Sequence, residues 1–268
     1  MKNKDFLVSS KFLVVPCYNE AKRLAPPEFW NAINDNAIRL VFVDDASSDS
    51  TSSKINQLNL SDFRLITLER NVGKANAIRT GFLSITSQIT EKSPTGENIL
   101  VGYVDADGAF APDDVIEMFR LGEQGSFDAV FASRVRLAGR EIHRSRIRHF
   151  IGRFIITFLS STKVRLPYDT QAGLKVFRYT PIIRECLSER FNTRWFFELE
   201  IFLRFHSIVG KPIQIWEEPL RYWKESKGSK VISIKSISLL SQILTLFLQL
   251  TRMSMKKNKG LNSAFSQD

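Results

Sequence analysis

The apolar residues of this chain fall into short runs separated by longer stretches of mixed character. Short runs rich in Val, Ile, Leu and Phe predict buried β-strands. Between them we expect one helix that begins at Pro26 or Pro27, a second through Ile55 and Leu58, and a third through Ala77, Ile78 and Phe82. Since strands and helices alternate, we expect an α/β fold with a mainly parallel sheet covered by helices. The predicted strands are residues 11–16, 40–43, 64–68 and 99–104.

Polar residues follow the predicted strands and their connecting loops. They are Glu20, Asp45, Lys74, Asp105 and Asp107. Because parallel strands end at the same edge of a sheet, where open α/β sheets bind ligands, we expect a rim of acids with one lysine. Such a rim suits a nucleotide diphosphate with a metal, since a Lys can meet phosphate as a point charge. The glycine patterns of dinucleotide-binding and P-loop proteins are absent from the sequence.

The pair Asp105 and Asp107 is the strongest single signal. Two carboxylates one residue apart repel each other unless a cation lies between them, and oxygen ligands of this kind favour Mg²⁺ or Mn²⁺. The alternative is that the pair are ordinary loop acids before a helix capped by Asp113 or Asp114. The rest of the chain favours the metal site.

Composition limits the classes of protein and of partner that the sequence allows. The 268 residues, 43% of them apolar, are enough for one substantial α/β domain with an appendage. A net charge of +10 implies an anionic partner, such as a nucleotide, a nucleic acid or a membrane surface. Cys17 and Cys186 are far apart in the sequence, so we expect neither a disulfide framework nor a zinc site. With only two cysteines, we expect the protein to work in a reducing compartment. The first apolar run ends at Pro16 and is too short for a signal peptide.

Two stretches suggest contact with a membrane surface. Residues 134–153 contain seven Arg and two His against one acid, and apolar residues then recur at helical spacing over 147–159. This pattern fits an interfacial helix, or a helix packed on the sheet. Ile237–Leu250 is apolar almost all round, but about 21 Å of helix falls short of a bilayer core of roughly 30 Å. We therefore expect a protein peripherally bound to the cytoplasmic face of a membrane.

Eight segments of the chain carry motifs in a fixed order: residues 14–20, 43–51, 71–74, 105–109, 132–134, 169–175, 194–200 and 228–230. Together they resemble the family 2 glycosyltransferases of the GT-A fold, in particular their dolichyl-phosphate β-glucosyltransferase branch among polyprenyl-phosphate glycosyltransferases. The resemblance extends over residues 12–230.

This resemblance implies a role for each rim residue. Residues at the positions of Pro16, Tyr18, Glu20 and Asp45 hold the nucleoside of the sugar donor in the family. Asp105 and Asp107 match the acids that engage ribose, diphosphate and Mg²⁺ or Mn²⁺. The mannose-transferring branch often has Gln where this chain has Ala109, which favours UDP-glucose over GDP-mannose.

The resemblance also implies an acceptor and a reaction. Arg134 is expected to meet the phosphate of a polyprenyl phosphate, since its guanidinium offers a fork of donors. Asp169 and Glu198 match positions near the reacting centre and are assigned to acceptor positioning or base work; the alternative is a turn carboxylate and a helix-face acid. A lipid phosphate is already an anion, so it can attack the anomeric carbon without a strong base, with inversion. Gln171 and Lys175 are assigned supporting roles.

The sequence thus predicts a catalytic domain over residues 1–230 and a basic, amphipathic C-terminal segment over 231–268. The main alternative is a family 2 enzyme that uses a saccharide or glycolipid acceptor. Nucleic-acid binding rests on charge alone and has no recognisable motif, so no nucleic-acid partner is expected. A nucleotidyltransferase lacks support because the Gly-rich N-terminal loop is absent.

Overall fold

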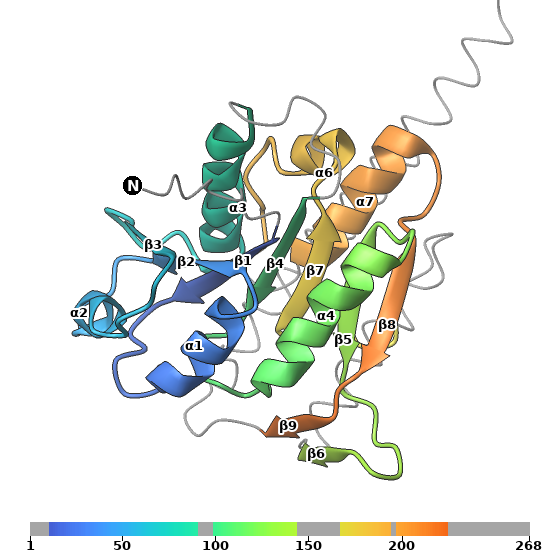
Figure 1. Ribbon diagram of the computed structural model, residues 1–268. Helices are drawn as coiled ribbons and strands as arrows, with labels where there is room; N and C mark the ends of the chain where they lie inside the picture. Colours follow the sequence, from blue (N-terminus) through green and yellow to red (C-terminus); the bar gives the residue numbers. More distant parts are fainter. Residues whose placement is uncertain (1–10, 91–98, 144–166, 194–196, 225–268) are drawn as a thin grey trace, which may run out of the picture.

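A computed structural model describes residues 11–90, 99–143, 167–193 and 197–224 (Figure 1). Within these residues, most strands join one seven-stranded sheet with helices on both faces. The sheet strands are β1 (Lys11–Cys17), β2 (Ile38–Asp44), β3 (Phe63–Thr67), β4 (Leu100–Val104), β5 (Ala129–Ser133), β7 (Leu174–Arg178) and β8 (Ile215–Pro219). The helices are α1 (Pro27–Asn34), α2 (Thr51–Asn56), α3 (Lys74–Thr90), α4 (Pro112–Gln124), α6 (Pro181–Cys186) and α7 (Phe197–Val209).

The strand order is β3-β2-β1-β4-β7-β5-β8. All neighbouring pairs are parallel except those of β7, which runs antiparallel to both β4 and β5. The predicted mainly parallel α/β sheet is therefore confirmed, with one reversed strand in its middle. Because Leu174 pairs with Val104, the start of β7 lies beside the end of β4. Two short parallel strands, β6 (Glu141–His143) and β9 (Tyr222–Lys224), form a separate small sheet near the same end of the molecule (Figure 1).

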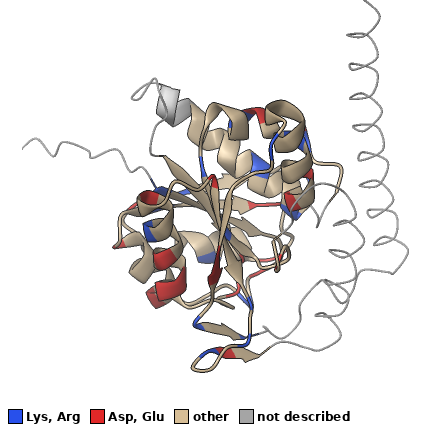
Figure 2. Ribbon diagram, turned by 90° about the vertical axis from the view of Figure 1, so that its right-hand side faces the viewer, with Lys and Arg blue, Asp and Glu red and all other residues tan. Residues whose placement is uncertain are grey.

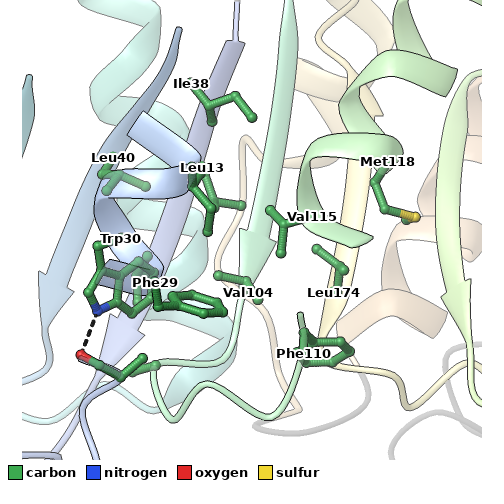
Figure 3. Packing of buried hydrophobic residues seen from close by; sticks show 14 of the residues in the cluster. Leu13, Phe29, Trp30, Ile38, Leu40, Val104, Phe110, Val115, Met118 and Leu174 are labelled. Carbon is green, nitrogen blue, oxygen red and sulfur yellow. Dashed lines mark hydrogen bonds between the residues drawn. The ribbon is translucent and has the colours of Figure 1, made fainter. Parts of the chain in front are cut away.

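Alternating side chains of the strands build a core on each face of the sheet. Phe12 and Val14 of β1 pack with residues of α3, α6 and α7, whereas Leu13 and Val15 pack with residues of α1, α2 and α4. On the second face Trp30 is fully buried and its indole N–H donates to the carbonyl of Ala25 at 2.9 Å (Figure 3). At about 25 cal/mol per Å² of buried apolar surface, an aromatic side chain of this size stabilises the fold by about 4–6 kcal/mol relative to full exposure.

The starts of α1 and α4 differ in how they agree with the sequence. Helix α1 does begin at Pro27, at a position where a missing N–H costs nothing. Helix α4 follows Ala111, which makes no side-chain cap, so the capping role considered for Asp113 or Asp114 is wrong. The Asp114 carboxylate instead accepts from the backbone N–H groups of Arg221 and Tyr222, each at 3.2 Å, and ties α4 to the start of β9.

Some sequence predictions lie outside the described residues. The amphipathic stretch 147–159 falls there, as do the motif at 228–230 and the whole C-terminal segment 231–268 with Ile237–Leu250. The boundary proposed at residue 230 therefore stays a prediction. In the part of the chain that the structure describes, every helix is too short or too polar to span a bilayer.

Candidate active site

The carboxyl edge of the sheet gathers the residues singled out from the sequence. Asp105 follows β4 directly, and its backbone N–H donates to the carbonyl of Gly173 at 3.1 Å. A Cβ atom added to Gly173 would lie 2.0 Å from Oδ2 of Asp105. The chain before β7 can therefore pass this close to the Asp105 carboxylate only because residue 173 has no side chain.

Asp105 forms an ion pair with Lys74, the first residue of α3. Burial alone would lower the pKa of Lys74, but the charge of Asp105, with those of Glu198 and Asp107, outweighs it and leaves that pKa above its ordinary value. The ammonium is therefore held in its charged form beside Asp105, where the sequence predicted a phosphate-binding cation.

Asp107 is paired with Arg23, a residue to which the sequence analysis gave no role. The guanidinium Nη2 lies 2.6 Å from Oδ2 of Asp107, and Nε lies 3.7 Å from a carboxylate oxygen of Glu20. The backbone N–H of Ala25 donates to the carbonyl of Ala106 at 2.9 Å, so the turn that carries Arg23 is attached to the loop that carries Asp107. The spacing Glu20-x-x-Arg23 could have indicated that Arg23 lies beside Glu20, but it carries no information about Asp107.

The expected nucleoside residues lie on two loops that are hydrogen-bonded together. The backbone N–H of Glu20 donates to the Thr51 hydroxyl at 2.8 Å, and that of Asn19 donates to the Ser47 hydroxyl at 2.9 Å. Tyr18 extends from the first loop with 40% of its surface exposed. These bonds fix the backbone of the first loop and leave the Tyr18 ring accessible to a ligand.

Two further nucleoside candidates are part of the framework beneath these loops. Pro16 lies within β1, paired with Val43 of β2. Asp45 is buried, and its two carboxylate oxygens accept from the N–H groups of Val72 and Gly73 at 2.7 and 2.9 Å. Asp45 thereby holds the turn that leads to Lys74 and positions the lysine for its ion pair.

Arg134 and Asp169 form a second charged pair, beyond the end of β5. Nε and Nη2 of Arg134 donate to the two oxygens of the buried Asp169 carboxylate at 2.7 and 2.8 Å. The guanidinium also lies 5.0 Å from the centre of the Trp223 ring. A guanidinium that makes two hydrogen bonds to one carboxylate and also packs on an aromatic ring has a fixed orientation. Asp169 and Trp223 together therefore set the direction of the Arg134 side chain.

Glu198 lies in a buried polar cluster at the start of α7. Its Oε1 accepts from the Tyr103 hydroxyl at 2.5 Å and from the Lys175 ammonium at 3.3 Å. Its Oε2 is buried without a hydrogen-bond partner in the described part of the chain. Burial, with the Glu198 charge second, raises the pKa of Tyr103 well above its ordinary value, so the hydroxyl keeps its proton and donates to Glu198.

Lys175 lies between the Lys74–Asp105 pair and the Arg134–Asp169 pair in electrostatic terms. Burial lowers its pKa, and Glu198 and Asp169 oppose this effect, while Lys74 adds to it. The fully buried ammonium thus interacts electrostatically with Asp169 and with Lys74. The Lys74–Asp105 pair and the Arg134–Asp169 pair therefore belong to one electrostatic unit that includes Lys175. The supporting role expected for Lys175 stays a prediction.

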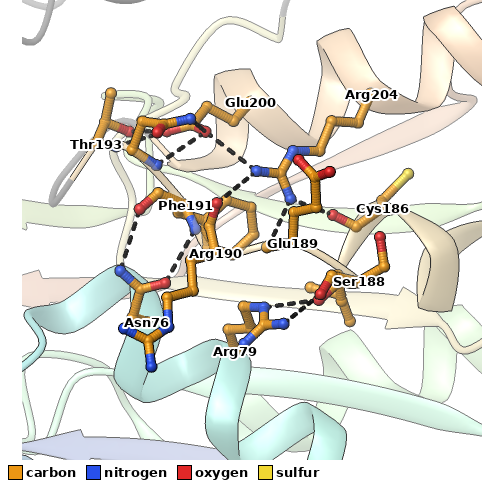
Figure 4. A network of polar contacts seen from close by, with 12 residues as sticks. Asn76, Arg79, Cys186, Ser188, Glu189, Arg190, Phe191, Thr193, Glu200 and Arg204 are labelled. Atoms are coloured by element: carbon orange, nitrogen blue, oxygen red, sulfur yellow. Dashed lines mark hydrogen bonds and ion pairs between the residues drawn. The ribbon is translucent and has the colours of Figure 1, made fainter.

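A separate network of polar contacts holds residues 186–193 (Figure 4). Glu200 accepts from the backbone N–H of Thr193 at 2.6 Å, and Arg204 donates to the carbonyls of Cys186, Glu189 and Arg190 at 2.7–2.8 Å. From α3, Asn76 bonds both the N–H and the carbonyl of Phe191, at 3.0 and 3.1 Å. These bonds attach residues 186–193 to α3 and to α7, the helix that carries Glu198.

The charges of the described residues are mixed rather than gathered on one face, as Figure 2 shows along the ribbon. Asp105 and Asp107 offer hard oxygen donors with side chains 36% and 14% exposed, so a ligand can reach them. In residues 11–90, 99–143, 167–193 and 197–224, no group of three or more acidic, His or Cys side chains could hold a metal alone. Mg²⁺ is commonly bound by one or two carboxylates together with substrate phosphates, and this donor set fits that arrangement.

Comparison with known proteins gives consistent results. Residues 12–189 match the family described as glycosyl transferase family 2. The dolichyl-phosphate beta-glucosyltransferase of Saccharomyces cerevisiae is 30% identical over 87% of this chain and 72% of its own length. The protein of the same name from Mus musculus is 33% identical over 82% of this chain and 69% of its own length.

Among solved structures, a mannosyltransferase from Pyrobaculum calidifontis in complex with GDP-Man and Mn²⁺ has a TM-score of 0.56. It is 16% identical, and the match covers 91% of this chain and 64% of that one. At this identity the likeness shows a shared fold, and it agrees with the GT-A architecture expected from the sequence.

Proposed function

Because this chain belongs to glycosyltransferase family 2 and is therefore a glycosyltransferase, we propose that it transfers glucose from UDP-glucose to a polyprenyl phosphate such as dolichyl phosphate. The observation that carries this proposal is the similarity to proteins named dolichyl-phosphate beta-glucosyltransferase, at 30–33% identity over more than four fifths of the chain. Ala109, where a Gln would favour a mannose donor, supports glucose as the sugar.

The donor is assigned to the edge formed by the ends of β1, β2 and β4. Tyr18 and Glu20 hold the nucleoside with Pro16 and Asp45, which shape the floor and the turn beneath it. Lys74 carries the positive charge that a diphosphate needs, and Asp105 orients that charge. The mixed acids and bases of this edge suit the ribose and the phosphates of a single ligand.

Asp105 and Asp107 are the residues that would hold a Mg²⁺ or Mn²⁺ ion together with the diphosphate. When bound, such an ion stabilises the negative charge that develops on the leaving nucleoside diphosphate. Lys74 contributes to the same end from the protein side, since its charge is fixed next to Asp105 before the donor arrives.

The acceptor phosphate is assigned to Arg134. Asp169 accepts two hydrogen bonds from this guanidinium and thereby sets its direction, so Asp169 acts as a positioning residue rather than as a base. The phosphate oxygen is already anionic and attacks the anomeric carbon directly, which inverts that carbon. Glu198 is buried with Tyr103 and Lys175, and its charge holds those two groups in place below the site.

We further propose that the protein acts at the cytoplasmic face of a membrane, where a lipid phosphate presents its head group. The sequence patterns behind this expectation, residues 147–159 and 237–250, lie outside the described residues. The basic residues around them would add attraction to anionic lipids, each worth about 1 kcal/mol. No nucleic acid has a part in this function.

The test is transfer of labelled glucose from UDP-glucose to dolichyl phosphate or undecaprenyl phosphate, with Mn²⁺ or with EDTA. We expect label in the organic phase only when lipid and metal are both present, and none for Asp107→Asn. Transfer to a saccharide or glycolipid instead would favour the alternative acceptor. Full activity of Asp107→Asn in EDTA would refute the metal role.

A further inference from the structure

The two acids of the proposed donor site each have a cation supplied by the chain itself. Lys74 pairs with Asp105, and Arg23 pairs with Asp107. Lys74 is the first residue of α3, and Asp45 binds the turn just before it, so the position of Lys74 is set by the helix and this turn. Arg23 instead lies on the short turn after β1, outside any helix or strand. Its pairing therefore needs a separate explanation.

The contact between Arg23 and Asp107 is built into the backbone. The N–H groups of Arg23 and Leu24 both donate to the carbonyl of Glu20, at 2.8 and 2.7 Å, which closes the turn. Ala25 then donates to Ala106, as described above. Gly108, at a φ of +65°, would bring a Cβ atom within 3.1 Å of the Ala25 side chain, so the two segments pack closely. Side-chain flexibility alone would not produce this arrangement.

The guanidinium of Arg23 lies between two carboxylates and is partly accessible. Its side chain is 21% exposed, against 14% for Asp107 and 12% for Glu20. A charge-assisted contact at 2.6 Å occupies one of the oxygens that a divalent cation would need. An anion that approached the same edge would find Arg23 within reach, since the Arg side chain is long and turns about several bonds.

We propose that Arg23 is an internal counter-cation of Asp107, which competes with the divalent metal in the free enzyme and turns to the donor diphosphate when the metal binds. This inference rests on the proposed function, because it concerns the same donor site. It makes metal and nucleotide bind cooperatively. Metal displaces Arg23 from Asp107, the released guanidinium gains a phosphate, and each ligand thereby raises the affinity for the other.

The experiment measures Mn²⁺ binding to the full chain by electron paramagnetic resonance of free Mn²⁺, with and without UDP and without acceptor. We expect Arg23→Ala to bind Mn²⁺ about tenfold more tightly than the unaltered protein in the absence of UDP, since a charged hydrogen bond no longer competes. We expect UDP to raise Mn²⁺ affinity less in Arg23→Ala than in the unaltered protein.

Two control variants separate charge from position. Lys22→Ala removes the same charge from an exposed neighbour and should leave Mn²⁺ affinity unchanged. Arg23→Lys retains the charge and should behave more like the unaltered protein than Arg23→Ala does. If Arg23→Ala fails to fold, as judged by circular dichroism, Arg23→Gln keeps a polar side chain at the same place and gives the same comparison.

The outcomes distinguish this inference from the proposed function. Equal Mn²⁺ affinity in the unaltered protein and the Arg23 variants, with binding lost in Asp107→Asn, would overturn the inference and leave the metal site standing. No Mn²⁺ binding by any variant, with or without UDP, would overturn both. Tighter binding by Arg23→Ala together with weaker cooperativity would support the exchange.

Discussion

Substituting Ala for Gly173 tests whether catalysis depends on the exact direction of the Asp105 carboxylate. The added Cβ would lie 2.0 Å from Oδ2, 2.5 Å from Cγ and 2.9 Å from Oδ1 of Asp105. Contacts this short do not occur, so one group must move. The Gly173 carbonyl accepts the backbone N–H of Asp105, and β7 continues directly from Leu174, so the backbone has little freedom. The carboxylate moves instead.

We expect Gly173→Ala to cause a small loss of stability and a large loss of activity. Overpacked sites cost about 1–3 kcal/mol, and we expect the lower end here because the Asp105 side chain is 36% exposed and can rotate toward solvent. That corresponds to a decrease in melting temperature of roughly 2–4 °C. Rotation separates Asp105 from Lys74 and from the position of the diphosphate, and loss of one such electrostatic contact lowers kcat by about 10²–10³-fold.

The assay is the rate of glucose transfer measured alongside thermal unfolding. Gly210→Ala is the matched control: it makes the same substitution at a φ of +72° with nothing within 4 Å of the added Cβ. A residue with a side chain is strained there by about 1–2 kcal/mol, so Gly210→Ala should lose stability and keep its activity. Near-normal transfer by Gly173→Ala would refute the reasoning, since the carboxylate direction would then be dispensable.

Three further predictions concern Lys175, Cys186 and Arg134. Lys175→Met should lower the free energy of unfolding in urea by about 3 kcal/mol because it removes the cation bonded to buried Glu198, and Lys175→Met combined with Glu198→Gln should recover part of that loss. Equal losses in the single and double variants would contradict this. The pKa of Cys186 is raised by burial to about 11, so a thiol reagent at pH 8 should label it only after denaturation; fast labelling of the native protein would show that the thiol is accessible. Arg134→Lys should raise KM for the lipid phosphate more than it lowers kcat, because Lys cannot make both bonds to Asp169; an unchanged KM would place the acceptor elsewhere.

The pH dependence of stability offers a related check on Lys175. Its folded-state pKa is lowered by burial, whereas in the unfolded chain it returns toward 10.5. Between these two values the unfolded chain binds more protons, so the free energy of unfolding should rise with pH in that window. Lys175→Met should remove this rise. A rise of equal size in the variant would mean that another group titrates.

Much of the fold could be predicted from the sequence. The apolar runs gave the first four strands, since Val-, Ile- and Phe-rich runs have few alternatives to a buried strand. The strand at Leu174–Arg178 was not predicted, because two of its five residues are basic, and nothing in so short a stretch indicates the direction of a strand. Direction depends on which strands it joins, and that is decided by packing far along the chain.

The site was predicted in part for a similar reason. Acids and a lysine that follow strands could be placed at one edge by the rule for parallel sheets, and Lys74 does meet Asp105 there. Arg23 and Trp223 were missed because their importance depends on a partner, 84 residues away in the case of Arg23. Periodicity describes neighbours along one element and carries no information about such pairs. The roles assigned to Asp169 and Glu198 stay predictions, although their burial and bonding now favour positioning.

The reversed strand also bears on how one side of the site could change during evolution. β5 ends at Ser133 beside the site, and β7 starts at Leu174 on the same edge of the sheet. The two ends of the connection between these strands therefore lie side by side, so the seven-stranded sheet sets no minimum length for it. Its described parts carry Arg134 and β6 after the first end and Asp169 before the second. A change in the length of this connection could thus alter the Arg134 side of the site and leave the strand order of the large sheet as it is.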